Sequence, residues 1–269
     1  MKQLKNIIFS GGGFKGWSYI GTIKALNETI NLKDLEQIIG VSIGASFSLF
    51  YLLQIDYKFL INYFLNMNLK EKIDIDLDSI IINQSIMQGH LYKKVVIDIM
   101  GAYKDITFIE LYRTINIKFT VCATNISTIN IEYFNYLLTP DVKVIDAIMA
   151  SSAVPILLPA YKINNNYYYD GGVCNNCPCN LVDPKTSIAF DITSQHEASE
   201  YKILDLIKIM SRMINKLNIT NEEIIYNISD EKYSKEFLNL DQSKDTTFNI
   251  YMDGYKKSVK ALNKFFEKG

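Results

Sequence analysis

The sequence has almost no net charge, because 28 Lys and Arg stand against 29 Asp and Glu, which leaves −1 at pH 7. So balanced a chain creates no global field that would attract nucleic acid or an anionic membrane, and any membrane contact must come from a local patch. Only five prolines occur, and no Pro- or Gly-rich linker or internal repeat divides the 269 residues. We therefore expect a single α/β domain over residues 1–269, without a nucleic-acid partner.

Cysteine is scarce, and its spacing does not fit a disulfide framework. Three of the four cysteines crowd into six residues: Cys174, Cys177 and Cys179. Reduced thiols in a cytoplasmic protein are the simpler interpretation. A structural zinc needs four ligands, and the remaining candidates, Cys122, His90 and His196, are distant in sequence. We therefore predict no metal and no other cofactor, and the absence of an EF-hand-like loop predicts an activity that does not need calcium.

No signal peptide is expected, because the apolar run Ile7–Phe9 is short and glycines follow at once. One segment, Gln37–Ile55, has no charged residue and is long enough to cross a bilayer. Its first two thirds, however, contain two glycines and three serines, which favours a strand, a sharp turn and a buried helix. We predict a cytoplasmic protein without a membrane span, and contact with a membrane surface stays open.

The order of predicted elements indicates a parallel sheet covered by helices. Strands are expected at Asn6–Ser10, Leu35–Ile39, Ile117–Ala123 and Ser187–Ile192. Helices are expected at Trp17–Glu28, Ala45–Leu53, Tyr57–Leu65, Val142–Ala150, Tyr201–Leu217 and Tyr255–Phe266. A hairpin with a three-residue loop, Asn164–Asn166, is expected after residue 160, and residues 56–107 suggest a cap over a site.

The segment Gly40-Val-Ser-Ile-Gly44 follows a predicted strand and opens a predicted helix. This is the context of a nucleophile elbow, in which Ser42 sits on a strained turn and Gly40 and Gly44 let the backbone pass closely. The helix N-terminus adds positive potential where an oxyanion would form. The plainer alternative is a small-residue turn with a buried serine.

The segment Gly11–Gly16 follows the first strand and fits the G-x-G-x-x-G pattern of dinucleotide-binding folds. That fold requires an acidic residue at the end of the second strand, but here the strand continues into the serine turn. The alternative use is an oxyanion hole built from backbone N–H groups. Loops after parallel strands share one edge of a sheet, so this loop should lie beside Ser42.

A third motif, Asp170-Gly171-Gly172, closes the Tyr-rich hairpin strand. The two glycines allow a tight turn that can hold the carboxylate close to another loop. Taken alone, an Asp-Gly pair is more often a solvated turn.

The motifs together resemble the patatin-like phospholipase family in kind and in order. They are Gly11–Gly16, Gly40–Gly44, Ala150–Pro155 and Asp170–Gly172, with further similarity at Thr107–Tyr112 and Ala123–Thr128. The resemblance covers roughly residues 4–192 and leaves a C-terminal helical extension, about 200–269, unassigned. One departure is Asn125, which stands where the family often has an acidic residue.

The resemblance implies a three-layer α/β/α sandwich with a mainly parallel sheet, and a lipid acyl hydrolase that acts on lipid or phospholipid esters. By that likeness Ser42 is the nucleophile and Asp170 its base, without a histidine. The resemblance assigns the oxyanion loop to Gly11, Gly12, Gly13 and Gly16, the elbow to Gly40 and Gly44, and the base turn to Gly171 and Gly172.

Two alternatives stay open. The first is a Ser-Asp-His esterase, whose chain order would be Ser42, then Asp146 or Asp170, then His196. The second is a catalytically silent module that binds a lipid or a nucleotide. A carboxylate base has an ordinary pKa of about 3.9, so an enzyme that uses one should stay active below the pH range in which a histidine base is deprotonated. Partial burial would raise that pKa.

Overall fold

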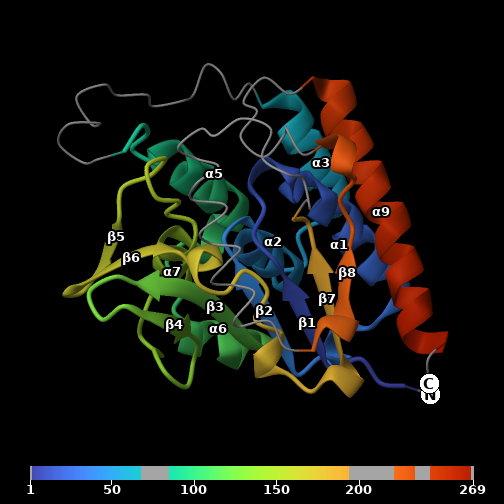
Figure 1. The fold of residues 1–269 in the computed structure, drawn as a ribbon, viewed down its shortest axis with the longest axis horizontal. Helices are drawn as coiled ribbons and strands as arrows, with labels where there is room; N and C mark the ends of the chain where they lie inside the picture. Colours follow the sequence, from blue (N-terminus) through green and yellow to red (C-terminus); the bar gives the residue numbers. More distant parts are fainter. Residues whose placement is uncertain (1, 68–84, 194–220, 234–242, 268–269) are drawn as a thin grey trace.

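The computed structural model describes residues 2–67, 85–193, 221–233 and 243–267 (Figure 1). Its centre is a mostly parallel sheet in the order β5-β6-β3-β2-β1-β7-β8, with β4 paired to β3. The strands are β1 (Asn6–Phe9), β2 (Gln37–Val41), β3 (Lys118–Asn125), β4 (Asn130–Phe134), β5 (Tyr161–Ile163), β6 (Asn166–Asp170), β7 (Ser187–Asp191) and β8 (Ile225–Asn227). The parallel pairing of β1, β2, β3 and β7 was predicted, and it puts their carboxyl ends at one edge.

Helices cover the sheet around one large apolar core. They are α1 (Ser18–Thr29), α2 (Ile43–Leu52), α3 (Tyr57–Asn66), α5 (His90–Met100), α6 (Phe108–Ile115), α7 (Val144–Ser151) and α9 (Lys244–Glu267). Because strand side chains alternate, Ile7 and Phe9 join this core. Ile8 faces the other side with a smaller cluster that includes Cys179. The helix predicted at Tyr201–Leu217 lies outside the described residues.

Several details differ from the sequence prediction. The hairpin loop has two residues rather than three, because Asn166 pairs with Ile163 as part of β6. Asn164 supplies the turn with a φ of 54°, which asparagine tolerates better than most residues. Strands β4 and β8, of five and three residues, were not predicted. Both are short and pair with a longer strand, so their own sequences carry little signal.

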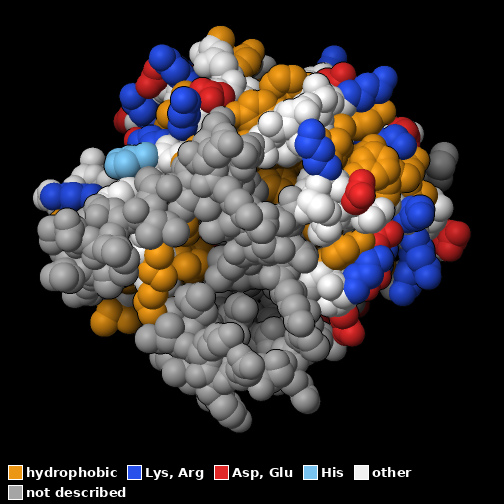
Figure 2. Space-filling view, turned by 90° about the horizontal axis from the view of Figure 1, so that it is seen from above, with side chains coloured by type: hydrophobic (Ala, Val, Ile, Leu, Met, Phe, Trp, Pro, Cys, Tyr) orange, Lys and Arg blue, Asp and Glu red, His pale blue; other side chains and the backbone are white. Residues whose placement is uncertain are grey.

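The surface seen from above carries both charge signs and hydrophobic side chains in close proximity (Figure 2). This mixture agrees with the near-zero net charge. Among the described residues no helix is both long and apolar enough to cross a membrane. The uncharged segment Gln37–Ile55 instead contains β2 and α2, as predicted.

The C-terminal helix α9 crosses α1 at very short range. A Cβ atom added to Gly254 of α9 would lie 2.4 Å from the carbonyl oxygen of Ser18, and one added to Gly21 of α1 would lie 2.3 Å from that of Tyr251. The crossing is completed by a 2.8 Å hydrogen bond between the hydroxyls of Thr22 and Ser258. Only glycine permits so close an approach of two helix backbones.

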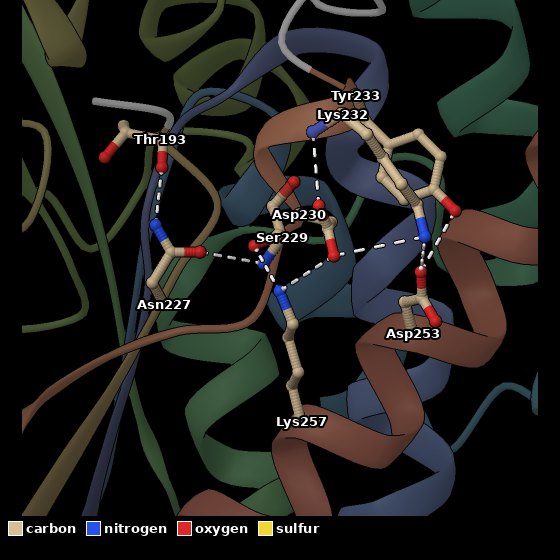
Figure 3. Close-up of polar contacts among 8 residues, drawn as sticks. All are labelled: Thr193, Asn227, Ser229, Asp230, Lys232, Tyr233, Asp253 and Lys257. Carbon is tan, nitrogen blue, oxygen red and sulfur yellow. Dashed lines mark hydrogen bonds and ion pairs between the residues drawn. The ribbon is translucent and has the colours of Figure 1, made fainter. Parts of the chain in front are cut away.

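A polar network fastens α9 to the segment that follows β8 (Figure 3). Lys257 donates to the carbonyl oxygen of Ser229 at 2.7 Å. Asp253 accepts from Lys232 at 2.8 Å and from the hydroxyl of Tyr233 at 3.0 Å. Half-exposed ion pairs contribute little individually, so we regard the network as fixing orientation and attribute most of the stability of α9 to its apolar contacts.

Candidate active site

Ser42 occupies the sharp turn between β2 and α2, as predicted. Its φ of 54° and ψ of −130° lie in a region that non-glycine residues rarely adopt. Two hydrogen bonds fix the turn. The Ser42 N–H donates to Ser151 Oγ at 2.8 Å, and the Ser151 hydroxyl donates to the carbonyl oxygen of Cys122 at 2.5 Å. The side chain of Ser151 thus joins the turn to the neighbouring strand β3.

The flanking glycines of the elbow are required by close packing. A Cβ on Gly40 would lie 2.4 Å from Cα of Ala45, and one on Gly44 would lie 2.4 Å from the carbonyl oxygens of Phe9 and Ser10. Backbone atoms cannot yield as side-chain ends can. The first turn of α2 therefore lies directly against the end of β1, and the serine is fixed at the carboxyl edge of the sheet.

The glycine loop after β1 lies beside Ser42, as predicted. A Cβ on Gly11 would be 3.0 Å from Cβ of Ser42, so Gly11 is in direct contact with the serine. Gly12 lies against Ile192, and Gly13 begins a 3₁₀ helix, η1 (Gly13–Trp17), with a φ of 59°. Gly16 packs on Ile43 of the elbow helix.

Asp170 is the last residue of β6 and is 5% exposed. Its Oδ1 accepts the Gly172 N–H at 2.6 Å, while Gly171 packs against the carbonyl of Cys122. Burial raises the pKa of Asp170 to about 6, and the Ser42 hydroxyl and the Gly172 N–H offset part of that rise. Oδ2 is buried and has no hydrogen-bond partner of ordinary geometry among the described residues. The carboxyl group of Asp170 is thus held close to the Ser42 hydroxyl.

The pairing of β3 explains why these two residues meet. Cys122 of β3 pairs with Val41 of β2, and the next residue, Ala123, pairs with Asp170 of β6. Strand β4 pairs with both Cys122 and Ala123 and so occupies the opposite edge of β3. Strands β2 and β6 therefore approach each other end to end along one edge of β3, and the residues at their tips are Ser42 and Asp170.

An apolar cavity of about 170 Å³ lies beside Ser42. Its walls come mainly from η1, α2, α5 and the segment after α7, and α3 contributes Phe64. Most lining side chains are aromatic or aliphatic, including Phe14, Trp17, Phe47, Phe64 and Leu157. Helices α3 and α5 belong to the region 56–107, which was predicted to cap a site. A cavity of this kind suits a flexible hydrocarbon chain.

Three hydroxyl groups form the polar part of this cavity besides Ser42. Tyr92 OH lies 2.7 Å from Ser46 Oγ and 3.2 Å from Ser152 Oγ. Burial raises the pKa of Tyr92, and the charge of Asp170 raises it further. The hydroxyl chain is therefore close to the carboxylate, and its members stay protonated in the physiological range.

The described structure places no imidazole beside Ser42. His90 is exposed at the first turn of α5 and is not among the cavity residues, while His196 lies outside the described residues. The other candidate acid, Asp146, accepts from Tyr161 at 2.6 Å and from Lys93 at 3.2 Å. Asp170, rather than Asp146, is therefore the acid that the fold brings to the serine.

The cysteine cluster lies next to the Asp170 turn. Cys177 and Cys179 have their sulfur atoms 3.6 Å apart, and all four cysteines are free thiols. Across the described ranges, no three His, Cys, Asp or Glu side chains gather as a metal site would require.

Sequence reasoning assigned no role to two residues that the structure places at the site. Ser151 was seen only as part of the motif Ala150–Pro155, and its bond to the elbow could not be inferred from spacing. No sequence pattern pointed to a role for Asn176, yet its side-chain amide donates to the carbonyl oxygen of Gly11 at 3.2 Å. Both act across more than 100 residues of sequence.

Known proteins resemble this chain in sequence and in fold. The profile of the family described as patatin-like phospholipase matches residues 7–183. The "Probable lipid hydrolase 463L" of Invertebrate iridescent virus 6 is 27% identical over 189 residues, which are 67% of this chain and 64% of that protein. The chain thus spans slightly less than two thirds of the length of that relative.

Two solved structures show the same fold. VipD from Legionella pneumophila superposes with a TM-score of 0.57 at 15% identity, over 98% of this chain and 67% of that one. The type III effector ExoU, from Pseudomonas aeruginosa, gives 0.56 at 15% identity, over 97% and 53% of the respective chains. The likeness confirms the predicted α/β/α class with a mainly parallel sheet. Because the family profile matches well over half of its residues, the chain belongs to the patatin-like phospholipase family.

Proposed function

We propose that this protein is a serine-dependent lipid acyl hydrolase, with Ser42 as the nucleophile and Asp170 as its base. The observation that carries the proposal is the end-to-end meeting of β2 and β6, which puts a strained serine beside a buried carboxylate at an apolar cavity. Family membership and the likeness to a probable lipid hydrolase support the substrate class.

The first half-reaction transfers the acyl group to Ser42. Ionised Asp170 accepts the hydroxyl proton as Ser42 Oγ attacks the ester carbonyl, and the acyl chain occupies the cavity. The tetrahedral intermediate collapses when Asp170 returns the proton to the leaving alcohol. A pKa of about 6 makes Asp170 a stronger base than an ordinary carboxylate while leaving it mostly ionised at neutral pH.

The second half-reaction returns the enzyme to its starting state. Water takes the place of the alcohol, and Asp170 accepts one of its protons as the oxygen attacks the acyl-enzyme. Collapse of this second intermediate releases the fatty acid, and the proton returns from Asp170 to Ser42 Oγ. The cycle consumes one ester and one water and needs no group beyond the chain itself.

We assign the oxyanion contacts to backbone N–H groups of the loop Gly11–Gly13. Gly11 touches Ser42, and no described residue accepts a hydrogen bond from the N–H groups of Gly11, Gly12 or Gly13. The Ser42 N–H is unsuited to this role because it already donates to Ser151. Loss of one such donor costs about 3–4 kcal/mol of transition-state stabilisation in other hydrolases.

The substrate is proposed to be met at a lipid surface, through an apolar tip formed by Ile126, Ile129 and Tyr167. Their exposed fractions are 41%, 88% and 44%. The Ile126 N–H donates to the carbonyl oxygen of Tyr167 at 2.9 Å, so the three residues belong to one protrusion. Because β3 continues three residues beyond the level of Val41, the tip projects from the same edge as Ser42. Ile129 also has a φ of 57°, which is unfavourable for a β-branched residue.

Substitution of the nucleophile tests the proposal. Ser42→Ala should abolish hydrolysis of a short-chain chromogenic ester and labelling by a fluorophosphonate probe. The matched control is Ser48→Ala on the same helix, whose buried hydroxyl has no hydrogen-bond partner among the described residues. Labelling that persists in Ser42→Ala would overturn the assignment, and a folded wild-type protein that takes no probe would favour the silent binding module.

A further inference from the structure

The side chain of Asn176 lies between the two loops of the proposed active site. Asn176 follows the turn that begins at Asp170, and its Nδ2 donates to the carbonyl oxygen of Gly11 at 3.2 Å. Its Oδ1 is packed so closely that a Cβ added to Gly11 would be 2.5 Å from it, and one added to Gly172 would be 2.6 Å from it. One amide group thus contacts the glycine loop and the base turn together.

The bond to Gly11 has a consequence for the next N–H group. The carbonyl of Gly11 and the N–H of Gly12 belong to one planar trans peptide unit, in which they point in opposite directions. A side chain that fixes this carbonyl therefore fixes the direction of the Gly12 N–H. Consecutive glycines restrict their own backbone less than any other residues, so the loop needs an external contact to hold one orientation.

The contact between Asn176 and Gly172 also affects the orientation of the Asp170 carboxylate. The Gly172 N–H donates to Asp170 Oδ1 at 2.6 Å, which leaves Oδ2 as the oxygen without a partner. Because Asn176 packs on Gly172 and Gly11 at once, it sets the spacing between the turn that orients the carboxylate and the loop that would bind the oxyanion. The cavity beside Ser42 is lined by other residues, so Asn176 has no contact with an acyl chain placed there.

We propose that Asn176 is a positioning residue that keeps the oxyanion loop and the Asp170 turn in register for the transition state. The inference rests on the proposed hydrolase function. A residue in this role stabilises the transition state without binding the substrate, so its loss should lower kcat and leave KM unchanged.

Two variants test this role. Asn176→Ala removes the amide, and Asn176→Asp keeps its shape but replaces the Nδ2 donor by an oxygen. Both should lower kcat for a soluble chromogenic ester by roughly 10- to 100-fold, since small misplacement of catalytic groups costs up to about 10²-fold. KM should stay within about twofold, and the rate of fluorophosphonate labelling, whose adduct also uses the oxyanion contacts, should fall in parallel with kcat.

The matched control is Asn180→Ala, which removes an amide from the same segment where it pairs with Asn175 at 3.0 Å. It should leave kcat unchanged, and the melting temperature should show that all three variants fold. If Asn176→Ala does not fold, the kcat and KM of Asn176→Asp test the inference instead. Full kcat in a folded Asn176 variant, or a raised KM with unchanged kcat, would refute the inference while Ser42-dependent hydrolysis by the wild type still supported the proposed function.

Discussion

At the scale of single residues, the buried carboxylate of Asp170 links activity to stability. Its pKa in the folded protein is about 6, raised from 3.8 mainly by burial. Ionisation is therefore costlier in the folded than in the unfolded chain. This cost is absent below pH 3.8, grows as the pH rises, and is complete above about pH 6. A shift of this size corresponds to at most about 3 kcal/mol.

We predict that Asp170→Asn lowers turnover by several orders of magnitude and raises the melting temperature above pH 6. The asparagine Oδ1 can still accept the Gly172 N–H, and the destabilising charge is gone. Below pH 4 the two proteins should melt alike, because Asp170 is then protonated. Thermal denaturation at pH 4 and pH 8 measures the difference; a variant with a lower melting temperature than the wild type at pH 8 would contradict this account.

The same pKa changes the expected pH profile. Turnover should fall as the pH drops through about 6, because the base must be ionised. The pH profile therefore separates the two bases less sharply than an ordinary carboxylate would, since burial brings the pKa of Asp170 close to the ordinary histidine value of about 6.5. The histidines must instead be tested directly. His90→Ala and His196→Ala should retain turnover if Asp170 is the base, and an inactive, folded His196→Ala protein would favour the triad.

At the scale of helices and strands, the crossing of α1 and α9 reaches the active site. The first residue of α1, Ser18, directly follows η1, and Gly254 of α9 packs on its backbone. A shift of α9 relative to α1 would therefore displace Ser18 and, through η1, the glycine loop that precedes it. A helix far along the chain thus supports the geometry of the proposed oxyanion site.

We predict that Gly254→Ala destabilises the protein and lowers kcat. The added Cβ would meet Ser18 backbone atoms at 2.4–2.8 Å, and overpacking of this kind typically costs about 1–3 kcal/mol. The gain in helix propensity, about 1 kcal/mol, offsets only part of that. Lys260→Ala, at an exposed position of the same helix, is the control. Equal urea midpoints for Gly254→Ala and the wild type would show that the helices can separate without cost.

The elements that could be predicted from sequence are those with strong local patterns. The parallel core strands and α1, α2 and α7 have apolar runs or turn signals of their own, and the glycine and serine motifs lie where parallel strands end. The strand β8 has three residues, and its place depends on pairing with β7. The roles of Ser151 and Asn176 depend on contacts between distant segments, which one sequence does not reveal.

At the scale of the whole molecule, the charge balance bears on how the protein meets lipid. With a net charge of −1 and both signs mixed on the face in Figure 2, attraction to anionic lipid should be weak. Contact should then depend on the apolar tip. Burial of one isoleucine side chain is worth about 1.5–3 kcal/mol, which corresponds to about tenfold or more in partitioning.

We predict that binding to phosphatidylcholine vesicles, measured by co-sedimentation, is insensitive to salt and falls about tenfold in Ile129→Asp. The control is Leu138→Asp, whose side chain is 65% exposed but lies beyond the other end of β4. Activity on a soluble ester should be the same in both variants. Binding that requires anionic vesicles and disappears at high salt would point to a charged patch instead of the tip.

The end-to-end arrangement of β2 and β6 has a consequence for how such an enzyme could diversify. The spacing of Ser42 and Asp170 depends on successive residues of one strand, Cys122 and Ala123. The walls of the cavity come largely from other elements, which are α2, α5 and the segment after α7, with Phe64 of α3. Residues of α3 and α5 can therefore be exchanged by mutation, and the preferred acyl chain altered, while the reacting pair keeps its geometry. The part of the cavity wall formed by α5 and Phe64 can thus change between related proteins without a change in the strand pairing that holds Ser42 and Asp170.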